Sequence, residues 1–183
     1  AVAAARRAFD DGRWSGLAPA ARKKVMHRIA DLIEQHMLEL AVLGVRDNGT
    51  EISMALRAEP GSAAGTFRYY AETCDKINGD IAPTPPGTLG LIHREPVGVV
   101  GAIVPWNFPL MIAAWKLAPA LAMGNSVVIK PAEVASMSIL RMVELCHEAG
   151  LPDGVLNAVT GEGAVVGEAL GLHGDVDVLL FTG

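Results

Sequence analysis

Residues 97–130 read VGVVGAIVPWNFPLMIAAWKLAPALAMGNSVVIK. The stretch begins with Val97–Val104, a run rich in β-branched residues that predicts a buried strand. Residues 110–123 then predict a helix, and Ser126–Lys130 predicts a second buried strand. Short apolar strands joined by a helix are typical of a parallel sheet that is covered on both faces. The stretch therefore predicts an α/β fold.

The same alternation continues to the last residue. We expect a helix over 136–149, a strand over 155–160, a helix over 164–170 and a strand over 176–181. The predicted architecture is a Rossmann-like parallel sheet with helices on both faces. In such sheets, ligands bind at the carboxyl ends of the strands.

The residues before this alternation have a different character. The apolar periodicity predicts helices over 2–10, over 19–36 with a continuation to Asn48-Gly49, and from 52 to about 77. This helical layer shows no catalytic pattern, and we interpret it as scaffold. Prolines and glycines then mark a linker or an extended arm. We therefore expect a helical layer at 1–77, an arm at 78–96 and a sheet core at 97–183.

Composition and charge exclude several classes of protein. The net charge of −5 argues against nucleic acid as a partner. The two cysteines, Cys74 and Cys146, lie in helix-like segments far apart in sequence, which favours a reducing compartment and unreactive thiols. No pattern of metal ligands is present, so we predict no metal site.

Two further features bear on location and completeness. Between Pro96 and Ile129 the only charged residue is Lys116, but prolines interrupt the run, so we expect buried strands and a helix and no membrane span. The chain begins AVAAARRAF, which does not resemble a signal peptide, and it ends within a predicted strand. We expect a piece of a longer, cytoplasmic protein.

The first predicted strand ends in an unusual turn, Pro105-Trp106-Asn107-Phe108-Pro109. The two prolines fix the backbone and remove hydrogen-bond donors. Asn107 could be the N-cap of the next helix. A carboxamide held at a strand end could also donate a hydrogen bond to a developing oxyanion. The sequence leaves both interpretations open.

Two later strand ends are candidates for binding a nucleotide. Lys130 leaves a buried strand, with Glu133 three residues on, and a carboxylate there would suit ribose hydroxyls. The alternative is an ordinary surface Lys–Glu pair. Thr160–Gly167 resembles a glycine-rich phosphate fingerprint but has one residue too many, so Gly163 and Gly167 predict only close approach of another group.

Several motifs together resemble the aldehyde dehydrogenase superfamily over the whole chain. The resemblance rests on PWNFPL, WKLAPALA, GN, KPAE, EAGLPDGVLN and FTG in this order, at residues 105–110, 115–122, 124–125, 130–133, 148–157 and 181–183. Asp47-Asn48-Gly49 and Glu95–Val99 fit as well. The resemblance implies an NAD-dependent enzyme that oxidises an aldehyde to a carboxylic acid through a cysteine thiohemiacetal.

The resemblance also implies roles for individual residues. Asn107 matches the asparagine of the oxyanion hole, and Phe108 and Trp115 match positions of the substrate tunnel. Lys130 and Glu133 match the pair that holds the adenine ribose of the cofactor. The other implied cofactor-binding residues are Ile103, Val104, Pro105, Trp106, Gly163, Gly167, Phe181 and Gly183. The nucleophilic cysteine and the general base lie downstream in the family, so the chain alone is expected to be inactive.

Other implications concern substrate, cofactor choice and assembly. The Glu133 carboxylate favours NAD over NADP, because it would repel a 2′-phosphate. The resemblance implies a small aldehyde as substrate and a homodimer or homotetramer built partly by the arm. Asp10–Trp14 resembles bacterial enzymes acting on amino-aldehydes such as γ-glutamyl-aminobutyraldehyde. Two alternatives stay open: a non-catalytic relative that keeps the fold for binding or structure, and a reductive or CoA-acylating family member. Pro105–Pro109 favours the hydrolytic, oxidising branch over the latter.

Overall fold

A four-stranded parallel sheet forms the centre of the protein. The computed structural model describes residues 1–183. Its strands β3 (Val99–Ile103), β4 (Ser126–Lys130), β5 (Leu156–Ala158) and β6 (Val178–Phe181) lie in the order β5-β4-β3-β6. The predicted parallel α/β sheet is confirmed, and the bounds of β4 are those expected from the sequence.

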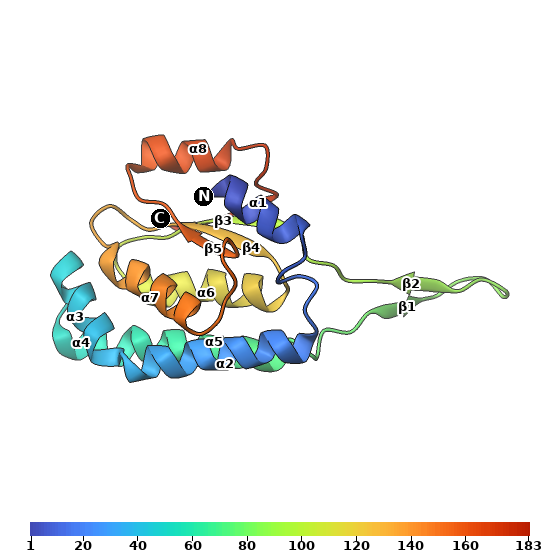
Figure 1. The fold of residues 1–183 in the computed structure, drawn as a ribbon, viewed down its shortest axis with the longest axis horizontal. Coiled ribbons are helices and arrows are strands. Elements are labelled where there is room, and N and C mark those ends of the chain that lie inside the picture. Colours follow the sequence, from blue (N-terminus) through green and yellow to red (C-terminus); the bar gives the residue numbers. More distant parts are fainter.

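Helices cover both faces of this sheet (Figure 1). On one face lie α1 (Val2–Asp10), the π-helical turn η1 (Gly163–Gly167) and α8 (Glu168–Gly171), and on the other lie α6 (Pro109–Ala122) and α7 (Met137–Glu148). The helices α2 (Pro19–Gln35) and α5 (Pro60–Thr73) form a further layer beyond α6. Because α6 is enclosed between this layer and the sheet, it is apolar nearly all round.

The hydrophobic core spans these layers. It includes Phe67 of α5, Leu117 and Leu121 of α6, and Ile129 of β4. Trp14, which follows α1, is completely buried, and its indole nitrogen donates a hydrogen bond to the Leu121 carbonyl at 2.8 Å. The N-terminal residues are therefore tied directly to the helix that follows β3.

Two of the predicted helices are interrupted. The helix expected over 52 to about 77 is divided into α4 (Ile52–Ala58) and α5, because Pro60 cannot donate to the preceding turn and restricts Glu59 before it. The continuous pattern expected from 19 to Asn48 is divided at His36 into α2 and α3 (Met37–Asn48). No proline or glycine marks this second break.

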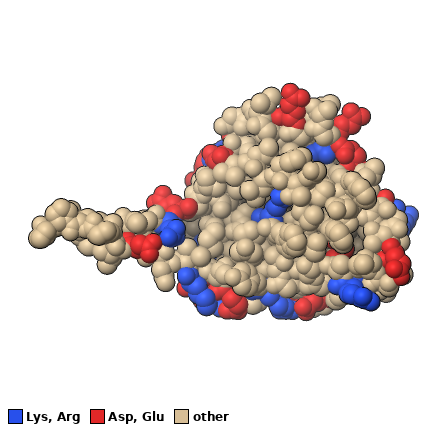
Figure 2. Space-filling view, turned by 180° about the vertical axis from the view of Figure 1, so that it is seen from behind, with Lys and Arg blue, Asp and Glu red and all other residues tan.

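A two-stranded hairpin projects from the body of the molecule (Figures 1 and 2). It pairs β1 (Asp80–Ala82) with β2 (Gly90–Ile92) in antiparallel register. Residues 81–92 contain no charged side chain, and Ile81, Leu89 and Leu91 are exposed. The charged residues Asp80 and Arg94 form an ion pair at its base. The hairpin is thus an apolar extension.

Regarding membranes, none of the helices has both the length and the apolar character needed to span a bilayer. The apolar stretch from Pro96 to Ile129 instead forms β3, α6 and β4 of the enclosed sheet.

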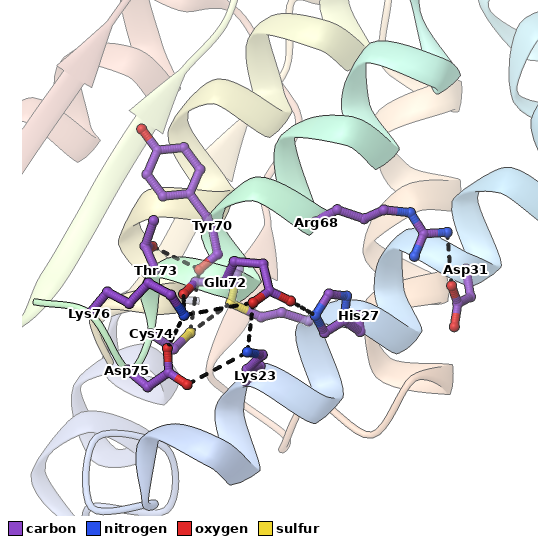
Figure 3. Close-up of polar contacts among 11 residues, drawn as sticks. Lys23, His27, Asp31, Arg68, Tyr70, Glu72, Thr73, Cys74, Asp75 and Lys76 are labelled. Atoms are coloured by element: carbon purple, nitrogen blue, oxygen red, sulfur yellow. Dashed lines mark hydrogen bonds and ion pairs between the residues drawn. The ribbon is translucent and has the colours of Figure 1, made fainter.

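An ion-pair cluster joins the surfaces of α2 and α5 (Figure 3). The Glu72 carboxylate lies 2.7 Å from Lys23 Nζ and 2.8 Å from His27 Nε2. Asp75 lies 3.6 Å from the same lysine. The hydrogen bond from Lys23, followed by that from His27, lowers the pKa of Glu72 below its ordinary value.

A carboxyl group whose pKa is lowered by folding stabilises the protein above its unfolded pKa, and this contribution is lost as the pH falls. We therefore expect Glu72→Gln to lower the Tm modestly at neutral pH. The difference from the parent should shrink at pH values below the ordinary carboxyl pKa of 4.5, and also at high salt. Thermal unfolding across a pH series tests this, with Glu51→Gln as the control, because the Glu51 carboxylate accepts a hydrogen bond from the Ser53 hydroxyl but forms no ion pair. A Tm difference that grows in acid would contradict the expectation.

Candidate functional site

The carboxyl ends of three strands meet at one edge of the sheet. Ile103, the last residue of β3, is paired with Lys130 of β4 on one side and with Phe181 of β6 on the other. The chain runs outward from β3 through β4 to β5 and then crosses to place β6 on the opposite side of β3. The order of strands therefore reverses at β3, and such a switch point is where open α/β sheets bind ligands.

Lys130 and Glu133 form a partly enclosed pair at this edge. The Lys130 side chain is buried, and Nζ donates to Glu133 Oε1 at 3.0 Å and to the Pro131 carbonyl at 3.1 Å. The alternative of an ordinary surface pair is therefore wrong for Lys130. The Glu133 side chain remains 45% exposed, so its carboxylate can still accept hydrogen bonds from a ligand.

The environment of Glu133 favours its charged form. Hydrogen bonding from its own backbone N–H, then from Lys130, lowers the pKa of the Glu133 carboxyl below its ordinary value. The backbone N–H of Gly163 adds a smaller contribution in the same direction. An ionised carboxylate held by a buried cation is suited to binding vicinal hydroxyl groups.

A cavity of about 580 Å³ opens beside this pair. Ile103, Gly163, Gly167 and Phe181 contribute to its wall. A Cβ atom at Gly163 would lie 3.7 Å from Glu133 Oε1, and one at Gly167 would lie 3.5 Å from Ile103 Cδ1. The two glycines thus keep side chains out of the space between η1 and the strand ends. The volume is within the usual range of ligand pockets.

These residues fit the adenosine part of a dinucleotide. The carboxylate can accept from a ribose, and the apolar cavity beside the glycines can enclose a flat ring. The other predicted cofactor residues differ in accessibility. Val104 is buried in the core, Pro105 is half-buried, and Trp106 is 59% exposed. Thr182 and then Gly183 come directly after the end of β6.

Asn107 lies in the turn between β3 and α6, with its side chain exposed. The N-cap of α6 is Phe108, and no side chain of the cap residue bonds to the helix. The interpretation of Asn107 as the N-cap is therefore wrong. Its carboxamide makes no hydrogen bond within the chain, so both N–H groups remain available to another molecule.

The residues around the turn differ in their burial and in their polar contacts. Phe108 is half-buried against the core, whereas Trp115 of α6 is 53% exposed. Lys116 Nζ donates to Thr182 Oγ1 at 2.8 Å and so connects α6 to the end of β6. Burial lowers the pKa of Lys116. The structure thus brings the Asn107 turn and the end of β6 to the same edge of the sheet.

Two polar contacts to this turn were not expected from the sequence. Asn48 Nδ2, at the end of α3, donates to the Trp106 carbonyl at 2.8 Å. Glu59 Oε2 accepts from the backbone N–H of Met111 at 2.9 Å. The Asp47-Asn48-Gly49 motif was visible in the sequence, but nothing indicated its partner. The helical layer interpreted as scaffold therefore reaches the candidate site.

Neither cysteine is placed to act as a nucleophile. Burial raises the pKa of the Cys146 thiol to about 12. Burial also raises the pKa of the Cys74 thiol, which is 6% exposed. Because the thiolate is the reactive form, both thiols are unreactive at neutral pH.

Similarity to known proteins agrees with this geometry. A sequence profile of the aldehyde dehydrogenase family matches residues 1–183. The chain belongs to this family. Over 183 residues it is 52% identical to the NADP/NAD-dependent aldehyde dehydrogenase PuuC of Escherichia coli (strain K12), covering 100% of this chain and 37% of that protein. The chain therefore spans little more than a third of the length of this relative.

Solved aldehyde dehydrogenase structures share the fold. An indole-3-acetaldehyde dehydrogenase in complex with NAD+ superposes with a TM-score of 0.95 at 52% identity, over 97% of this chain and 36% of that chain. A gamma-glutamyl-gamma-aminobutyraldehyde dehydrogenase from Burkholderia cenocepacia J2315 gives a TM-score of 0.95 at 49% identity, with the same coverage of 97% and 36%. The sequence-based assignment to the superfamily is confirmed.

Proposed function

We propose that this chain is the N-terminal, NAD-binding part of an NAD-dependent aldehyde dehydrogenase that oxidises an aldehyde to a carboxylic acid. The observation that carries the proposal is the pairing of buried Lys130 with Glu133 at the switch point of the sheet, beside the cavity at Gly163 and Gly167. The neighbouring strand end presents Asn107. The family membership supports the same conclusion.

The residues of this chain have separable tasks in that reaction. When bound, NAD supplies the hydride acceptor. Glu133, held by Lys130, accepts hydrogen bonds from the adenine ribose, and Gly163 and Gly167 leave room for the base. Asn107 donates an N–H to the aldehyde oxygen as negative charge develops there, which stabilises the transition state. Phe108 and Trp115 line the path of the substrate.

The nucleophile and the general base of this proposal lie beyond Gly183. A cysteine thiolate attacks the aldehyde carbon to give a thiohemiacetal. Loss of its hydride to the bound cofactor would oxidise this adduct to a thioester, which a carboxylate-activated water then hydrolyses to the carboxylic acid. The substrate walls also come partly from that region, so we propose only the class: a small aldehyde. An amino-aldehyde is supported by the structural relative named for gamma-glutamyl-gamma-aminobutyraldehyde.

The sequence that follows Gly183 and an activity measurement test the proposed function. The full-length protein, supplied with NAD and a panel of aldehydes, is expected to form NADH and the matching acid, and to lose activity when its downstream cysteine is alkylated. A downstream sequence without a nucleophilic cysteine, together with no NADH formation, would favour the non-catalytic relative instead.

Cofactor choice follows from the charge of Glu133. The carboxylate accepts from ribose hydroxyls but repels a 2′-phosphate, which carries a charge of about −1.5 to −2. We expect kcat/KM of the full-length enzyme to be higher with NAD than with NADP, and Glu133→Gln to narrow this ratio. The preference is informative because the relative from Escherichia coli is named for both cofactors. Equal kcat/KM values for the two cofactors in the parent would refute the expectation.

We also propose how the chain is organised and how it assembles. The helical layer 1–77, the arm 78–96 and the sheet core 97–183 act as parts of one NAD-binding domain. The apolar hairpin of β1 and β2, with exposed Ile81, Leu89 and Leu91, supports assembly into a homodimer or homotetramer through the arm. Contiguous exposed apolar surface is typical of such contacts. We propose a cytoplasmic enzyme without nucleic-acid or membrane partners.

A further inference from the structure

The turn that carries Asn107 has few backbone hydrogen bonds of its own. Pro105 and Pro109 have no N–H to donate. Val104 is the last residue before the turn with a sheet contact, since its N–H donates to the Lys130 carbonyl at 3.2 Å. Because the exposed Asn107 side chain makes no hydrogen bond that would orient it, its direction depends on how the backbone on either side is held.

Two side chains from the helical layer hold that backbone. Asn48 Nδ2 donates to the carbonyl of Trp106, the residue directly before Asn107. Glu59 accepts the N–H of Met111 in the first turn of α6. Glu59 is only 7% exposed, and burying a carboxylate is costly unless it is well hydrogen-bonded. The turn is therefore held both before and after Asn107.

The orientation of Asn48 is itself fixed. Its Oδ1 accepts from the Thr50 N–H at 3.0 Å and from the Thr50 hydroxyl at 2.7 Å. This arrangement identifies Oδ1 as the acceptor and directs Nδ2 at the Trp106 carbonyl. Gly49, whose φ of +74° favours glycine, ends α3 at this point and turns the chain toward Thr50.

We propose that Asn48 and Glu59 are positioning residues that fix the direction of the Asn107 carboxamide. The inference rests on the proposed function, because it assigns the helical layer a part in the same reaction. A small displacement of an oriented group can lower a rate by up to about 10²-fold. Loss of one of the two contacts is expected to cost roughly 10-fold in kcat, since the other remains.

Three variants of the full-length enzyme separate positioning from simple stability. Asn48→Asp keeps an acceptor for Thr50 but has no donor for Trp106. Glu59→Leu removes the acceptor for Met111, whereas Glu59→Gln keeps an acceptor oxygen. We expect the first two to lower kcat roughly 10-fold with the KM for NAD unchanged, and Glu59→Gln to retain most of the parent's kcat.

Hydrogen exchange gives a readout that does not need activity. Asn48→Asp is expected to speed amide exchange in residues 106–112 while β4 and α2 stay protected. Asp47→Ala is the matched control, because Asp47, at the same helix end, accepts from the N–H of Met137 at the start of α7 instead. It should speed exchange there and leave 106–112 unchanged. Unchanged exchange in 106–112 of Asn48→Asp would overturn the proposal.

A double-mutant cycle with Asn107→Ala completes the test. If Asn48 acts through Asn107, the kcat loss of Asn48→Asp disappears once Asn107 is alanine. Additive losses would show that Asn48 does not act through Asn107, and so would an Asn48→Asp enzyme with the parent's kcat. If Glu59→Leu fails to fold, the Asn48 cycle and the exchange measurement still decide. A parent that oxidises no aldehyde would instead refute the proposed function, and the exchange result would then decide whether the turn is held as described.

Discussion

Replacing Asn107 with alanine in the full-length enzyme is expected to lower kcat about 10²–10³-fold, or roughly 3–4 kcal/mol of transition-state stabilisation. The carboxamide is exposed at the strand end and makes no hydrogen bond within the chain, so its removal leaves the folded structure intact. Since the donor acts mainly on the developing oxyanion, the loss should fall on kcat while NAD affinity is kept.

The measurement compares Tm, the Kd for NAD, kcat and single-turnover rates between the parent and Asn107→Ala. Single-turnover rates are needed because a slow product-release step would mask part of the loss. Asn78→Ala is a suitable control, since Asn78 is another exposed asparagine but lies next to the hairpin. A stable Asn107→Ala enzyme with the parent's single-turnover rate would exclude Asn107 from the oxyanion hole.

The second large effect is a complete loss: the 183-residue chain by itself should form no NADH from any aldehyde. Its only thiols, Cys74 and Cys146, are buried and have raised pKa values, so neither can attack a carbonyl at neutral pH. One oxyanion donor without a nucleophile and a base cannot carry the reaction.

The test supplies purified chain with NAD and aldehyde beside an equal molar amount of the full-length enzyme. Circular dichroism establishes that the chain is folded under the assay conditions. One contrary outcome is that the chain still forms NADH after both Cys74→Ser and Cys146→Ser substitutions. Such a result would show that aldehyde oxidation does not need a thiol from this region. NADH formation that those substitutions abolish would identify one of these cysteines as reactive.

Local patterns in the sequence predicted the sheet and its ligand-binding edge. Val97–Val104 and Ser126–Lys130 are short segments rich in β-branched residues. Their residue types alone therefore predicted that they form strands and where these strands lie. Pro60, which divides residues 52–77 into two helices, was also visible in the sequence. The apolar pattern continued across it, so one helix was predicted. The break at His36 had no such signal, because neither a proline nor a glycine lies there.

The contacts that hold the Asn107 turn could not be predicted in the same way. Asn48 and Trp106 are 58 residues apart, and Glu59 and Met111 are 52 apart. A side-chain contact over such a separation depends on the final packing of two layers and leaves no periodic trace in the sequence. The choice between helix cap and free carboxamide at Asn107 likewise required the backbone of the turn.

The position of β6 determines the order in which the sheet can be completed during synthesis. β3, β4 and β5 follow one another along the chain and lie side by side, so each can pair soon after it is made. β6 instead pairs with β3, in a register that places Val100 opposite Val178, and the second edge of β3 therefore stays open until β6 emerges from the ribosome. An open strand edge can pair with another chain. β6 thus covers an aggregation-prone edge at the centre of the nascent sheet.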